Sequence, residues 1–187
     1  MNLLNFLFLF AAAVSQPQQP QQKGQKAAPL PIEQAGSGTY GAVRIESIDA
    51  IGIVKLNGTH VMQAVQLQGS LIANDAQIDS FHVVGDANVS HCTVKKPSDV
   101  TGYIQAQKTL FQGDMLLTLQ RAVFTHSTLQ GVTIRPNPGF KSKQVLELRQ
   151  HTVVQGPIVF ESGNGEVHLF SGSKVLGGVT GGKVLQK

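Results

Sequence analysis

The chain has 187 residues, of which 15 are Lys or Arg and 11 are Asp or Glu, so its formal net charge is +4. Only 14% of the residues are charged and 6% are aromatic, with no Trp, whereas a typical soluble domain has about 25% charged residues. This length predicts one domain with additional segments. Because no basic run is interleaved with aromatic residues, the composition argues against nucleic-acid binding.

The first fifteen residues have the features of an export signal. An apolar core begins at Leu3, and small residues follow it up to Ser15. Cleavage after Ala13 or Ser15 would satisfy the small-residue rule at a processing site, although no Lys or Arg precedes the core. The core is shorter than the roughly 20 apolar residues that a membrane-spanning helix needs. We therefore expect a signal peptide at 1–15, an exported protein (periplasmic, cell-surface or secreted), and no membrane span after cleavage.

Residues 16–31 read QPQQPQQKGQKAAPLP, with repeated Pro and Gln and almost no apolar content. This composition predicts a disordered, Pro/Gln-rich linker before a folded domain at 32–187. The chain has a single cysteine, Cys92, so an intramolecular disulfide is excluded. The domain must therefore be held together by packing alone.

The folded part is built on an internal repeat. The stretch VQLQGSLIANDAQI, which begins at Val65, has equivalents that begin at Ile48, Phe81 and Ser98. These four copies are spaced by 16 or 17 residues and keep apolar or small residues at the same positions. Alternation of apolar and polar residues indicates short strands that bury one face.

Each copy has three such strands, and the alternation shifts between them. In the first copy the inward pairs begin at Ile48, Val54 and Thr59. Corners between the pairs coincide with Gly52 and with Asn57-Gly58, residues that tolerate positive φ. The pattern predicts an all-β fold, a three-sided single-stranded β-solenoid (β-helix) with about 16–17 residues per turn. About seven turns would give a rod about 35 Å long.

Equivalent positions on successive turns are expected to form columns. A fifth copy is assigned from the alternation of Leu117, Leu119, Ala122 and Phe124, and an insertion is assigned to residues 135–144. The expected corner column is Gly52, Gly69, Gly85, Gly102 and Gly131, and the expected core wall is Val61, Ile78, Val94, Phe111 and Phe124.

Three groups of residues are candidates for a catalytic or metal-binding role. Cys92 falls in a column of small inward residues, Thr59, Ala76, Thr109 and Ala122, so we interpret it as a small hydrophobe of the core. The six histidines do not share columns, so they offer no convergent zinc ligands. His82 and Asp99 fall on adjacent turns and can pair, and we expect no Ser, Lys or second carboxylate beside them. The sequence therefore predicts no catalytic, cofactor-binding or metal-binding residues, and no cofactor.

The outward columns are the remaining candidates for binding. The first outward column is predicted to contain Asp49, Gln66, His82, Asp99 and Thr128. The second is predicted to contain Ile51, Gln68, Val84, Thr101 and Gln130. The third is predicted to contain Ile53, Ser70, Asp86, Tyr103 and Val132. Such flat strips suit a protein or carbohydrate partner.

The repeat V-x-L-x-G-x-L-x-A-x-x-A-x-I resembles that of the bactofilins, bacterial polymer-forming proteins. The resemblance covers about Ile48 to Phe160 and rests on repeat shape alone. It implies a right-handed β-helix, filaments formed by end-to-end stacking, and no enzyme activity. The sequence departs from the family in its export signal and in the insertion, since bactofilins are typically cytoplasmic.

Two functional hypotheses remain open at this point. The first is an exported, non-enzymatic structural or scaffolding protein that self-associates through the ends of its solenoid, where sheet edges are unpaired. The second is a secreted or surface binding protein or adhesin that uses an outward face. An enzyme of the β-helix polysaccharide class is least favoured, since no acidic cluster is evident.

Overall fold

The computed structural model describes residues 28–137, 139 and 142–187. In these residues the chain forms eighteen β-strands and no helix. The expected signal peptide at 1–15 lies outside the described residues, as does most of the expected linker. Residues 28–31 carry no strand and lead directly into the first one.

The strands vary from two to fifteen residues. The first nine are β1 Ile32–Tyr40, β2 Arg44–Ile45, β3 Ile48–Asn57, β4 His60–Asn74, β5 Gln77–Ser90, β6 Thr93–Val94, β7 Ser98–Gln107, β8 Leu110–Phe111 and β9 Met115–Thr125. The other nine are β10 Thr128–Leu129, β11 Val132–Arg135, β12 Gln144–Arg149, β13 Val153–Val154, β14 Ile158–Phe160, β15 Gly165–Leu169, β16 Lys174–Val175, β17 Val179–Thr180 and β18 Gly182–Gln186.

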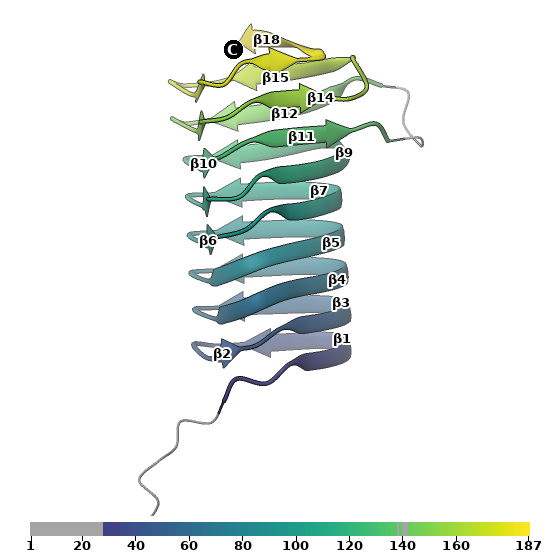
Figure 1. The fold of residues 1–187 in the computed structure, drawn as a ribbon, viewed down its shortest axis with the longest axis vertical. Helices are drawn as coiled ribbons and strands as arrows, with labels where there is room; N and C mark the ends of the chain where they lie inside the picture. Colours follow the sequence, from purple (N-terminus) through teal and green to yellow (C-terminus); the bar gives the residue numbers. More distant parts are fainter. Residues whose placement is uncertain (1–27, 138, 140–141) are drawn as a thin grey trace, which may run out of the picture.

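The strands stack in parallel as a β-solenoid of about nine turns, which confirms the predicted fold class (Figure 1). Each strand pairs with the strand one turn away, so that Ile48 lies beside Val65 and His82 beside Asp99. The first turns therefore contain 16 or 17 residues. The prediction of about seven turns was too low, because β1 and β2 add a turn before Ile48 and β16 to β18 add one after Phe160.

The core is the inside of the coil, filled by the inward residues of all three sides. Val61, Ile78, Val94 and Phe111 form one wall and are fully buried or nearly so. The wall continues to Leu129. Phe81, Phe111 and Phe124 meet edge to face, with ring centroids 6.5 Å and 5.7 Å apart, an arrangement that aromatic rings favour.

One corner is fixed by a column of glycines, Gly52, Gly69, Gly85 and Gly102, which has the predicted register. Their φ angles lie between +133° and +141°. A Cβ at Gly85 would lie 2.0 Å from the carbonyl oxygen of Gly69, so both conformation and space require glycine at this corner.

The register predicted for the fifth copy was wrong. Gly102 pairs with Leu119 instead of Gly131, and Phe124 lies beside Ala106 rather than beside Phe111. A register shift between Gly102 and Ile104 accompanies the change. The last member of each predicted outward column is therefore different. Leu116 lies beside Asp99 in place of Thr128, and Thr118 lies beside Thr101 in place of Gln130. Val132, which was predicted to face outward, is buried and lies beside Met115.

The insertion assigned to 135–144 falls between β11 and β12. The Gln144 amide nitrogen donates hydrogen bonds to the carbonyl oxygens of Leu119, at 2.8 Å, and Arg135, at 2.6 Å. The buried Gln144 side chain thus links the two ends of the insertion to each other and to β9 on the preceding turn. The coil therefore continues after the insertion.

Candidate functional site: an axial trough

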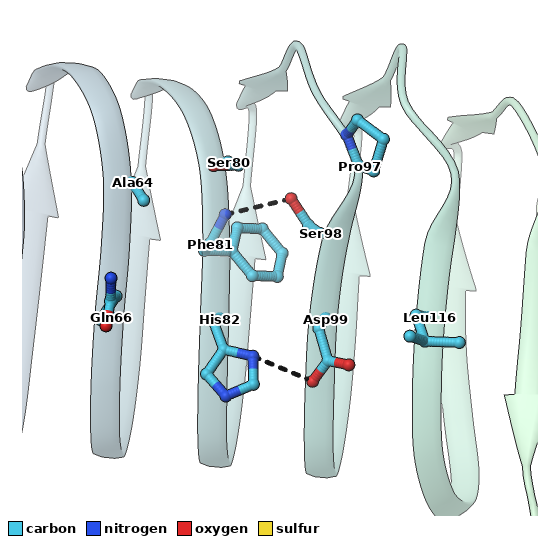
Figure 2. Close-up of a pocket in the computed structure, with 9 residues that line it drawn as sticks. All are labelled: Ala64, Gln66, Ser80, Phe81, His82, Pro97, Ser98, Asp99 and Leu116. Carbon is cyan, nitrogen blue, oxygen red and sulfur yellow. Dashed lines mark hydrogen bonds and ion pairs between the residues drawn. The ribbon is translucent and has the colours of Figure 1, made fainter.

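A groove of about 430 Å³ lies on the outside of the solenoid. It crosses β4, β5, β7 and β9 near a corner, as Figure 2 shows. Its lining combines apolar and polar groups: Ala64, Gln66, Ser80, Phe81, His82, Pro97, Ser98, Asp99 and Leu116. Concave, mainly apolar sites with a few polar groups are typical of ligand binding.

His82 and Asp99 lie at the centre of this groove, and their predicted pairing is confirmed. His82 Nδ1 is 3.3 Å from Asp99 Oδ1, an ion pair when the imidazole is protonated. The side chain of His82 is 57% exposed and that of Asp99 21%. The expectation that no serine lies beside the pair was wrong, since Ser80 and Ser98 line the same groove.

The Ser98 hydroxyl is committed to the fold. It accepts a hydrogen bond from the Phe81 N–H at 3.1 Å and donates one to the Lys96 carbonyl oxygen at 3.2 Å (Figure 2 shows the first). Ser98 is also buried. Its oxygen is therefore held against the backbone rather than presented to the imidazole.

Asp99 Oδ1 has an unusual position. It is buried and has no hydrogen-bond partner, since His82 Nδ1 approaches it outside hydrogen-bonding geometry. Among the described residues it is the one buried side-chain oxygen or nitrogen of which this is true. A buried polar atom without a partner is costly, and the exposed His82 side chain is the group that lies against this one. A ligand that displaced the imidazole would reach an acceptor without a hydrogen bond.

A second hollow, of about 270 Å³, continues the groove along the same side of the coil. The two hollows share Gln66 and His82, and the second extends to Asp49. Together they form a shallow channel parallel to the solenoid axis, which we call the axial trough. Its central column is Asp49, Gln66, His82, Asp99 and Leu116, one residue from each of five successive turns.

Leu116 and Pro97 were missed as members of this site. Leu116 was missed because the fifth copy was placed in the wrong register. Pro97 precedes the first residue of β7, and its place in the groove depends on the path of the corner. The pairing rule for adjacent turns would have identified Leu116 if the register had been correct.

Cys92 has the structural role that was predicted, beside the predicted neighbours Ala76 and Thr109, but one member of the predicted column was wrong. It is buried and lies in a column with Thr109 and Ser127, not with Ala122, which lies beside Ile104. Burial raises the pKa of the Cys92 thiol, against an opposing effect of its backbone hydrogen bonds. A buried, protonated thiol is a poor nucleophile.

Two of the histidines do lie together, contrary to the expectation that none shares a column. The rings of His126 and His151 are 6.0 Å apart, on successive turns. Both residues, and His91, adopt positive φ at a corner. No group of three or more His, Cys, Asp or Glu that could hold a metal ion occurs in the part of the chain that the structure describes.

The C-terminal turns carry a network of charges around two carboxylates, the buried Glu147 and the partly buried Glu166. Glu147 accepts from Arg121 at 2.7 Å and from Arg149 at 2.6 Å. Glu166 pairs with Lys143 and with His168. The hydrogen bond from Lys143, followed by that from His168, lowers the pKa of Glu166 to about 2. These carboxylates are therefore already satisfied, in contrast to Asp99.

The two ends of the coil differ. At the N-terminal end the Tyr40 hydroxyl donates to Gln34 Oε1, and the partly buried Tyr40 and Ile32 pack against the core. At the C-terminal end Val175 and Val179 are only partly buried, and Val184 is 46% exposed. The described residues contain no apolar helix of membrane-spanning length.

Comparisons of this chain with protein-family models, with curated proteins and with solved structures find no match.

Proposed function

We propose that this chain is an exported, non-enzymatic scaffolding protein that self-associates through the C-terminal end of its solenoid. The observation that carries the proposal is the exposure of Val184. Its column mates Leu71, Ala87, Ile104 and Val167 are all fully buried, so Val184 occupies a core position on the last turn that the structure describes.

The backbone at this end supports the same proposal. β16, β17 and β18 pair with β13, β14 and β15 on one side only. Their outer N–H and C=O groups form a sheet edge, and such edges pair readily with another chain. Leu176, which is 66% exposed, adds apolar surface to this end. A second copy would cover the valines and complete the strand pairing.

The N-terminal end is less apolar, because the polar side chains of Gln34 and Tyr40 occupy the positions beside the core residues Ala50 and Leu56 and bond to each other. Joining at the C-terminal ends alone gives a two-fold pair of solenoids, the commonest symmetry among homo-oligomers. Longer polymers, as the resemblance to bactofilins implies, require the outer edge of β1, which is also paired on one side only, to associate as well. The proposed function thus includes bactofilin-like polymerisation, and export directed by a signal peptide at residues 1–15.

Sedimentation velocity over a range of protein concentrations tests this proposal. Wild-type protein is expected to form larger species as concentration rises. Val184→Lys should stay monomeric, because a lysine ammonium in the joint would be buried without a partner. Leu110→Lys is the matched control, since Leu110 is 39% exposed and lies on β8, which is paired with a strand on both sides in the middle of the coil. Wild-type protein that remains monomeric at every concentration would refute the proposal.

A second candidate function is supported by a different observation, the Asp99 oxygen without a partner. We propose that the axial trough gives the chain a binding role toward a protein or carbohydrate, whether or not the ends associate.

A further inference from the structure

We propose that the axial trough binds an extended basic peptide, with cationic side chains at positions i and i+4 and an apolar side chain at i+2. This inference rests on the binding role proposed for the trough and specifies its ligand. It does not depend on association through the C-terminal end.

The charges of the trough favour a cation. Asp49 and Asp99 belong to its central column, and the residues that line its two hollows include no Lys or Arg. The nearby Lys95 and Lys96 pair with Asp79, at 3.8 Å and 2.7 Å. An ammonium or guanidinium group that displaces the exposed imidazole of His82 would donate to Asp99 Oδ1, which has no hydrogen bond within the fold.

The spacing of the two carboxylates favours an extended chain. Asp49 and Asp99 lie three turns apart, and parallel strands are spaced by about 4.8 Å, so their Cα atoms are separated by about 14 Å. An extended peptide rises about 3.4 Å per residue, so residues i and i+4 lie about 13.5 Å apart on one face. Two cations of one strand can therefore reach both carboxylates.

The middle of the trough suits an apolar side chain. The residue at i+2 would lie midway between the carboxylates, near Gln66 and His82, and would cover Val84, which is 44% exposed. Beyond the carboxylate of Asp99, Pro97 and Leu116 in the groove wall offer an apolar surface to the stem of a lysine or arginine. Long basic side chains commonly bury their methylene stems in this way.

A carbohydrate fits these features less well. Each buried sugar hydroxyl needs a hydrogen-bond partner, and of the two groove serines Ser98 is already committed to the backbone. The chain itself carries the pattern at Lys183, Leu185 and Lys187, but β18 is paired with β15. A segment of a partner protein is therefore the better occupant than a second copy.

The test is an NMR titration of the whole protein with acetyl-Lys-Ala-Leu-Ala-Lys-amide, following the backbone amides of His82, Asp99 and Leu116. We expect these amides to shift. A peptide with the second lysine at i+3, which places it on the opposite face, and a peptide with norleucine for lysine should each bind about tenfold more weakly. Asp99→Asn should weaken binding of the first peptide by about tenfold, whereas Asp86→Asn, on a different side of the coil, should not.

Each outcome decides between the alternatives. Equal binding of the norleucine or i+3 peptide, or unchanged binding by Asp99→Asn, would overturn the inference. If maltotriose shifts the same amides and the peptides do not, the basic-peptide inference fails while a binding role survives. If neither ligand shifts them, the binding role fails as well. If Asp99→Asn abolishes self-association in sedimentation, the occupant is a second copy and the assignment to a partner is wrong.

Discussion

The backbone N–H of Ala76 donates a hydrogen bond of 3.3 Å to the Sγ of Cys92 on the next turn. The same contact repeats along the coil: the N–H of Cys92 donates to Thr109 Oγ1, and that of Thr109 to Ser127 Oγ. Further on, the N–H of Ser127 donates to Thr152 Oγ1. A column of small polar side chains thus satisfies buried corner amides, and Cys92 is one member of it.

This column predicts losses of stability of different size for two substitutions of Cys92. Cys92→Ser keeps an acceptor for the Ala76 N–H and should change the free energy of unfolding by no more than about 1 kcal/mol. Cys92→Val removes the acceptor and should cost about 1–3 kcal/mol, because a buried N–H is left without a partner. Urea denaturation measures both. A valine variant as stable as the serine variant would show that the hydrogen bond contributes nothing.

The thiol of Cys92 should also be unreactive in the folded protein. Burial raises its pKa, so the thiolate fraction at pH 8 is lower than in the unfolded chain, and access is restricted as well. We expect alkylation by iodoacetamide to be far slower in native protein than in urea. Comparable rates in the two states would contradict both the burial and the direction of the pKa change.

The glycine corner predicts a large difference between two similar substitutions. At Gly85 a Cβ would lie 2.0 Å from the Gly69 carbonyl oxygen, whereas at Gly36, the first glycine of the column, it would meet nothing within 4 Å. Both have positive φ. Gly36→Ala should therefore cost only the backbone strain, about 1–2 kcal/mol, and Gly85→Ala more than about 3 kcal/mol. Thermal unfolding of the two variants measures the difference, and equal losses would mean that the turns are not stacked as described.

The ion pairs of Glu166 predict an acid-sensitive contribution to stability. Its pKa is lowered from about 4.5 to about 2 by Lys143 and His168. A lowered pKa in the folded state means that the contribution is present above pH 4.5 and is lost as the pH falls toward 2. Melting temperatures of wild type and Glu166→Gln should therefore converge across this range. Parallel profiles for the two proteins would exclude the effect.

The fold was predictable because the first four copies mark their own register. Each has a glycine at the corner, from Gly52 to Gly102, and the alternation on either side of it identifies the faces. The fifth turn lacks this marker, since Leu119 replaces the glycine. Alternation alone has a period of two and does not distinguish one face from the next, so Leu117 and Leu119 were assigned to the wrong side.

The candidate site was predictable only in part, for a related reason. The closeness of His82 and Asp99 follows from the repeat length, and both were placed in one outward column. The groove also needs Leu116, whose position depends on the misassigned fifth turn, and Pro97, whose position depends on the corner. The lack of a hydrogen-bond partner at Asp99 Oδ1 depends on side-chain geometry, which a repeat pattern does not predict.

Electron microscopy of the purified protein at several concentrations tests the central claim, association through the C-terminal end, most directly. A single solenoid of about nine turns is a rod about 40 Å long. We expect rods joined end to end, at least twice this length, that become more frequent with concentration and disappear in Val184→Lys. Single rods at every concentration, or joined rods that persist in Val184→Lys, would contradict the claim.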